Sequence, residues 1–159
     1  LGVFLYEKLE EVKRDLKVFL ISVIIGGIVG IISVIIILVL FNAPEIISRS
    51  LAAKSVTTPI AIEITKITEG IPEITAGIVI ITGILGNAFG PIVLKKMGVK
   101  NKKAVGTALG TSAHGIGTAR AFEISASAGT YSGLAMCFNG IITALLAPYI
   151  LDWLLSFAQ

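Results

Sequence analysis

The sequence predicts an all-α integral membrane protein with about three full transmembrane helices and two broken or re-entrant helical hairpins. Of its 159 residues, 55% are hydrophobic and only 14% are charged, whereas soluble domains carry about a quarter charged residues. The apolar residues also gather in long runs without charge, as spans of a lipid bilayer require. The net charge of +3 does not indicate a nucleic-acid partner.

The first 17 residues predict an amphipathic helix. Leu5, Leu9, Val12 and Leu16 recur at helical spacing, and charged residues lie between them. Such a helix suits the surface of a membrane. Packing against another soluble segment is the alternative interpretation.

Three runs without charge are each long enough to cross a bilayer. They cover residues 18–44, 74–94 and 131–151. At ~1.5 Å per residue, about 20 helical residues span the ~30 Å hydrocarbon layer. In the first run, Gly26 and Gly30 form a small-xxx-small step that admits a neighbouring helix.

Two further stretches are apolar but interrupted. Residues 44–70 and 102–127 lack the unbroken apolar run of ~20 residues that a simple span needs. Each stretch predicts two short helices that meet at a breaker, TTP at 57–59 in the first and HGIG at 114–117 in the second.

The order of these pieces repeats along the chain. The segment AIEI at 61–64 precedes a span that ends in PIVL at 91–94. In the same way, AFEI at 121–124 precedes a span that ends in PYIL at 148–151. Breaker, acidic residue, span and late proline therefore recur together, which indicates an internal repeat.

The membrane topology follows from the positions of the lysines and arginines. They cluster before the first span and again in residues 95–103, and both clusters are expected to be cytoplasmic. The first interrupted segment then enters from the outer side and the second from the inner side. The basic loop at 95–103 therefore joins two hairpin-plus-span units, 45–94 and 104–151, of opposite orientation. Such an inverted repeat is typical of secondary transporters.

The two breakers predict a cavity that binds a ligand, because irregular backbone at membrane depth must face protein or water. Helices that start at Pro59 and near Gly117 would direct free N–H groups at the midplane, where they suit a carboxylate. Thr58 is expected to be the N-cap of the first of these helices, and capping alone is its alternative role. The candidate substrate-binding residues are Thr57, Thr58, Pro59, His114, Gly115, Gly117, Thr118 and Arg120.

Charged and titratable residues near the breakers are candidates for binding and ion coupling. Arg120 would cost roughly 2.5–3.5 kcal/mol at mid-membrane, which favours a functional contact to a substrate carboxylate. A local ion pair with Glu123 is the structural alternative. Glu63 and Glu123 are candidate proton or cation carriers, although Glu63 also suits a solvated outer end. His114 is either a third coupling candidate or a satisfied hydrogen-bonding residue.

Neither a metal site nor an enzyme is expected. One histidine and one cysteine in different segments do not supply a metal ligand set, so the sequence predicts no cofactor. Ser112 and His114 lie two residues apart with no oxyanion hole implied, which argues against hydrolysis.

The sequence resembles the LrgB/CidB family of membrane proteins, mainly through the motif H-x-I-G-T-A-R that begins at His114. Family members often have Ala where this chain has Gly115. Relatives also carry hydrophobic sequence before the equivalent of Leu1, so we expect this chain to lack the family's N-terminal portion. The matching stretches are KSVTTPIAIEI at 54–64, GIPEITAGIVIITGILGNAFGPIVL at 70–94, GTSAHGIGTARAFEI at 110–124 and GLAMCFNGIITALLAPYIL at 133–151.

The resemblance implies a function in transport, because the family includes the plastid glycolate/glycerate transporter. The expected substrates are small monocarboxylates such as glycolate, glycerate or pyruvate. The alternative that it implies is an antiholin-like regulator of murein hydrolase release and lysis. Such a regulator works with a small holin-like membrane partner, using exposed faces such as that of Gly26 and Gly30. A homo-oligomer in a prokaryotic plasma membrane is expected in either case.

Overall fold

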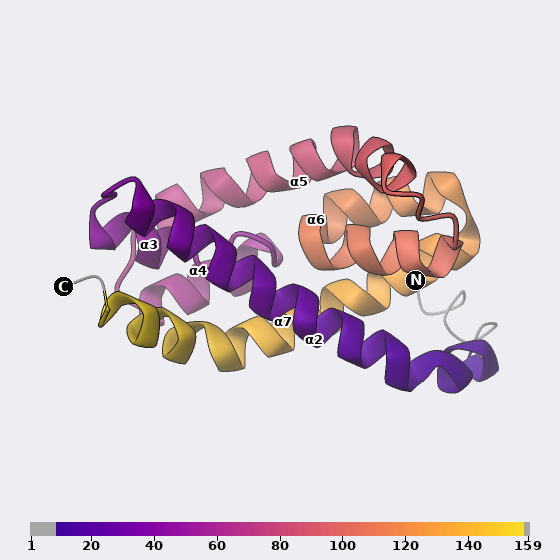
Figure 1. Cartoon of the computed structure of the whole chain (residues 1–159), viewed down its shortest axis with the longest axis horizontal. Helices are drawn as coiled ribbons and strands as arrows, with labels where there is room; N and C mark the ends of the chain where they lie inside the picture. The colour runs from indigo at the N-terminus through magenta and orange to yellow at the C-terminus, as the bar shows by residue number, and fades with distance from the viewer. Residues whose placement is uncertain (1–8, 158–159) are drawn as a thin grey trace.

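The computed structural model describes residues 9–157, which form six α-helices and no strand (Figure 1). Three of these helices, α2, α5 and α7, are long and apolar enough to cross a membrane. The chain is therefore an all-helical integral membrane protein, as the sequence predicts. The helices are α2 (Leu9–Leu40), α3 (Glu45–Leu51), α4 (Thr58–Ile67), α5 (Pro72–Lys96), α6 (Lys102–Ile124) and α7 (Ala126–Leu155).

The first span is one continuous helix that includes part of the predicted amphipathic segment. α2 begins at Leu9 and runs through Lys17 without interruption, so residues 9–17 are not a separate surface helix. The remainder of that prediction, residues 1–8, lies outside the described residues. In Figure 1, α2 crosses nearly the full length of the molecule.

α2 ends before the predicted boundary at residue 44 because of a left-handed residue. Asn42 has a φ of 52°, and the N–H of Ala43 donates to the carbonyl of Leu38 at 2.9 Å. This is a Schellman C-cap, in which a left-handed residue turns the chain so that backbone N–H groups beyond the helix donate to its last carbonyls. Asparagine tolerates the conformation better than most residues.

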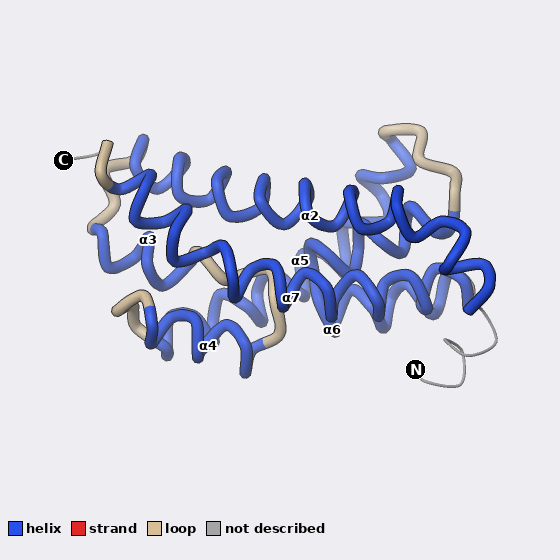
Figure 2. The backbone as a smooth tube through the Cα atoms, turned by 90° about the horizontal axis from the view of Figure 1, so that it is seen from below, coloured by secondary structure: helices blue, strands red, loops and turns tan. Residues whose placement is uncertain are grey.

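The second and third spans extend beyond the charge-free runs. α5 includes Lys95 and Lys96 in its last turn, and α7 begins at Ala126, before the predicted start at 131. Pro91 and Pro148 lie inside these helices, so neither late proline ends its span. Figure 2 shows that short loops join the helices and that little of the described chain is irregular.

α6 is broken in its middle. Ala113 (φ −131°, ψ 16°) and His114 (φ 43°, ψ −132°) leave the helical conformation, at the first residue of the predicted breaker. The two halves fold back against each other. They approach so closely that a Cβ on Gly117 would lie 2.6 Å from the carbonyl oxygen of Leu109. Figure 1 shows these halves as neighbouring coils.

The prediction of Thr58 as the N-cap of α4 is wrong by one residue. Thr57 is the N-cap, with extended backbone and no hydrogen bond from its side chain, and Thr58 is already helical. Pro59 is thus the second helical residue. Proline fits there because the first four N–H groups of a helix have no partner within it. Its lack of an N–H therefore costs the helix no hydrogen bond.

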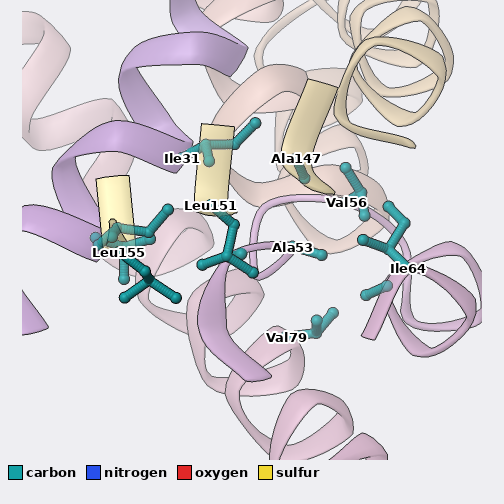
Figure 3. Close-up of a cluster of buried hydrophobic side chains, with 12 residues drawn as sticks. Ile31, Ala53, Val56, Ile64, Val79, Ala147, Leu151 and Leu155 are labelled. Carbon is teal, nitrogen blue, oxygen red and sulfur yellow. The ribbon is translucent and has the colours of Figure 1, made fainter. Parts of the chain in front are cut away.

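α3 and α4 are joined by residues 52–57, called here the α3–α4 connection. It packs into a core cluster shared with α2, α5 and α7 (Figure 3). Ala53 and Val56 of the connection are each 1% exposed. The connection is thereby fixed in place between the spans, although it is not itself helical.

Candidate ligand cavity

A cavity of about 940 Å³ lies between α2, α5, α6 and the α3–α4 connection. One face of α2 and the first half of α6 supply most of its wall, at the three- and four-residue spacing of a single helix face. The second half of α6 contributes no lining residue. The polar lining residues are Asp15, Ser22, Lys54, Ser55, Thr82, Asn101, Lys103, Thr107, Thr111, Ser112 and Tyr131.

The hydroxyl groups in this wall present hydrogen-bond acceptors to the cavity. Ser22, Thr107 and Ser112 each donate their proton to the carbonyl four residues earlier, at 2.8 to 2.9 Å. The oxygen of each hydroxyl keeps lone pairs free to accept another hydrogen bond. The wall therefore carries mostly uncharged polar groups on a largely apolar surface.

Small residues on α2 let both interrupted segments approach this helix. A Cβ on Gly26 would lie 3.1 Å from Cγ2 of Thr111, and one on Gly30 would lie 3.8 Å from Oγ of Ser55. Both glycines line the cavity, so the prediction that they form an exposed face for a partner is wrong. The sequence correctly marked the small-xxx-small step as a close approach, but the neighbours are segments of the same chain.

Asn139 of α7 connects the two interrupted segments. Its side chain is fully buried, and its Nδ2 donates to the carbonyl oxygens of Ser55 at 3.3 Å and Thr111 at 3.0 Å. Its Oδ1 has no hydrogen-bond partner among the described residues and faces Gly27, where a Cβ would lie 2.6 Å away. One amide thus holds the α3–α4 connection and the end of the first half of α6 beside each other.

α5 holds the break in α6 from the other side. His114 is 5% exposed, and its Nε2 lies 2.9 Å from the carbonyl oxygen of Val79. Because a carbonyl only accepts, Nε2 carries the proton in this bond. Asn87 Nδ2 donates to the carbonyl of Ile116 at 3.1 Å. A positive φ at a histidine is strained, and these bonds stabilise it.

The predicted substrate-binding residues lie beside the cavity wall and not in it. Gly117 and Thr118 are buried, Gly115 and Pro59 are exposed, and Thr57 and Thr58 lie between these extremes. The residues that do reach the cavity from the breaks are Ser55 and Ser112, each two positions before a predicted breaker.

Thr118 and His114 belong to one hydrogen-bonded group within the break. Thr118 Oγ1 donates to the carbonyl of His114 at 2.8 Å and lies 2.9 Å from the hydroxyl oxygen of Ser132 on α7. These bonds satisfy buried polar atoms and fasten the second half of α6 to α7.

The predicted charged residues form local ion pairs outside the cavity. Arg120 pairs with Glu123, three residues later on the same helix, and the two side chains are 42% and 63% exposed. Glu63 pairs with Lys66 at 2.7 Å on an exposed face of α4. None of these residues lines the cavity. The structure thus brings Arg120 to Glu123 and not to the breakers.

Three charged residues that line the cavity were not singled out from the sequence. Asp15 Oδ2 accepts from Lys103 Nζ at 2.6 Å and from the hydroxyl of Tyr131 at 3.0 Å. Lys54 Nζ donates to the Oγ of Ser55 at 3.2 Å. One signal for Lys54 was present, since it is the sole charged residue between Arg49 and Glu63.

The fold and the cavity define a polytopic α-helical membrane protein whose cavity, beside interrupted segments, carries several polar groups. A family model described as the LrgB-like family matches residues 1–153, so the chain belongs to this family. This result confirms the resemblance that the motifs indicate.

Several bacterial proteins are similar to this chain over more than nine-tenths of its length. A protein of Haemophilus influenzae is 38% identical over 94% of the chain and 65% of its own length. The holin-like protein CidB of Staphylococcus epidermidis is 28% identical over 92% and 64%. The antiholin-like protein LrgB of Bacillus cereus is 28% identical over 94% and 65%. The chain thus spans just under two thirds of these three relatives, and no solved structure matches it.

Proposed function

We propose that the protein is a secondary transporter of small monocarboxylates, of the glycolate, glycerate or pyruvate type, in a prokaryotic plasma membrane. The observation that supports this proposal is the cavity of about 940 Å³, whose charged lining is two lysines and one aspartate. A concave site with a net positive lining and several hydroxyl groups suits a small anion that carries oxygen atoms. We therefore propose a carrier and not an enzyme.

In this proposal the two interrupted segments are re-entrant hairpins of an inverted repeat. Their tips lie near the middle of the membrane and contribute Ser55 and Ser112 to the binding cavity. The shared hydrogen bonds of Asn139 to Ser55 and Thr111 support this arrangement, because they bring the two segments together. Irregular backbone at membrane depth is tolerated beside such a cavity.

The proposal is tested by carboxylate uptake into proteoliposomes. Vesicles that contain the purified protein and internal unlabelled glycolate are expected to accumulate external labelled glycolate by exchange. Labelled ethylene glycol, which has the same skeleton without the charge, is expected to show no exchange above protein-free vesicles. If glycolate and glycerate also exchange no faster than in protein-free vesicles, the protein is not a carrier for this class.

An antiholin-like regulator of lysis is the second candidate function. The names of the Staphylococcus epidermidis and Bacillus cereus relatives, holin-like CidB and antiholin-like LrgB, favour it. The outer face of α5, where Ile80, Ile84 and Phe89 are 49% to 58% exposed, offers an apolar surface to a small membrane partner or to another subunit. Lysis that depends on a co-expressed holin-like partner, with no carboxylate exchange, would favour this candidate over the carrier.

A further inference from the structure

We infer that Lys54 is the residue that binds the ligand's carboxylate, and that Arg120 is not. The inference rests on the proposed function and assigns the anion site within the cavity. Lys54 lies in the α3–α4 connection and lines the cavity, whereas Arg120 does not.

The position of Lys54 is fixed by its neighbours. Ala53 and Val56 are buried in the core cluster that Figure 3 shows, and the carbonyl of Ser55 accepts from Asn139. The backbone on both sides of Lys54 is therefore anchored. An anchored backbone places the ammonium group in the cavity at little further cost in chain entropy, which is a requirement of a preorganised site.

The charges around the cavity leave Lys54 without a carboxylate partner. Among the described residues, Asp15 is the sole carboxylate in the lining, and it accepts from Lys103 and Tyr131. Lys54 has a neutral partner, the hydroxyl oxygen of Ser55. As an ammonium, the lysine therefore retains two N–H donors for a ligand.

An ammonium without a counter-ion in a membrane interior is expensive, and such groups mark ligand pathways by default. A ligand carboxylate would supply the missing negative charge and accept from the free N–H groups. Arg120 already has a counter-ion in Glu123. Its Nε is buried without a hydrogen-bond partner among the described residues, but the residue does not line the cavity. The geometry thus assigns to Lys54 the role that the sequence assigned to Arg120.

Equilibrium binding of labelled glycolate to the purified protein tests this inference with three matched variants. Lys54→Gln is expected to weaken binding roughly tenfold or more, the loss expected for a charge-assisted hydrogen bond. Lys54→Arg keeps the charge and is expected to retain part of the affinity. Lys66→Gln removes an exposed lysine outside the cavity and is expected to bind like the wild type.

Amine labelling of the wild-type protein gives a second readout that needs no variant to fold. Glycolate is expected to protect Lys54 from an amine-reactive reagent, as measured by mass spectrometry, while ethylene glycol does not. Protection of Lys54 by glycolate with normal labelling of Lys66 supports the inference.

The outcomes separate this inference from the proposed function. If the wild type neither binds nor exchanges glycolate or glycerate, the carrier function fails and the assignment of Lys54 fails with it. If the wild type binds glycolate and Lys54→Gln binds equally well, or if Arg120→Gln alone loses binding, the carrier function stands and the assignment of Lys54 is overturned.

Discussion

At the scale of single residues, side-chain amides donate hydrogen bonds to backbone carbonyls beside the interruptions. A break in a helix frees carbonyl groups, and an unpaired carbonyl in a low-dielectric interior is costly. Asn139 donates to the carbonyls of Ser55 and Thr111, and Asn87 donates to the carbonyl of Ile116, all close to an interruption. These two asparagines lie in otherwise apolar spans because the breaks they support lie beside them.

Asn139→Ala is expected to destabilise the protein by about 2–4 kcal/mol, because it leaves two carbonyls unsatisfied and opens a small cavity. Asn87→Ala is the matched control, since Asn87 is only partly buried and makes one such bond. Its loss should be about 1 kcal/mol. Denaturation in detergent measures both values, and an equal loss in the two variants would contradict the role given to Asn139.

The residue scale is also where the sequence was least informative about the site. Lys54 and Arg120 are both cations beside a breaker, and nothing in their spacing says which one faces a cavity. Packing sets which way the Arg120 side chain points. Gly117, Thr118 and Ala121 form the buried face of the second half of α6. Arg120 consequently lies on the other face. A helical projection of these small residues would have indicated this orientation.

At the scale of elements, α6 and α7 pack so closely that their backbones touch. A Cβ on Gly106 or Gly110 would lie 2.1 Å from the carbonyl oxygen of Ala128 or Ser132. Close packing of this kind is the main source of helix association in lipid, where no hydrophobic effect drives helices together.

Gly110→Ala is expected to destabilise the protein by about 3 kcal/mol or more, because the clash is with backbone that cannot rotate away. Gly77→Ala is the matched control: it lies in α5, and a Cβ there meets nothing within 4 Å. The control should be neutral or stabilising by up to ~1 kcal/mol through helix propensity. Thermal unfolding in detergent measures both variants, and a Gly110→Ala protein as stable as wild type would rule out the close contact.

The three membrane spans were predicted well, because apolar composition defines them. The ends of helices were predicted less well, because they depend on the backbone conformation of single residues. Long charge-free runs identified the three spans. The end of α2 depends on the left-handed backbone of Asn42, and the start of α4 on extended backbone at Thr57 rather than Thr58. Asn42 followed by Pro44 is a helix-stop signal that the span prediction did not use, whereas Thr57 and Thr58 are equally suitable N-cap residues.

At the scale of the whole molecule, the cavity exists because two distant interruptions and one glycine-bearing helix face meet. Ser55 and Ser112 lie 57 positions apart in the sequence, yet both line the cavity opposite Gly26 and Gly30 of α2. The sequence indicated both interruptions and a close approach on α2. It did not indicate that they share one chamber, since that depends on contacts between segments far apart in the chain.

Accessibility of single cysteines at Ser55 and Ser112 tests most directly whether the two interruptions form one ligand cavity. The measurement uses a background in which the exposed native Cys137 is replaced by serine, and a Lys100→Cys variant in the exposed loop after α5 serves as control. Both cavity cysteines are expected to react with a small water-soluble maleimide. Glycolate is expected to slow both reactions, ethylene glycol neither, and the control should not respond to either compound. Cysteines at Ser55 and Ser112 that do not react, or that react at the same rate with and without glycolate, would contradict the shared ligand cavity.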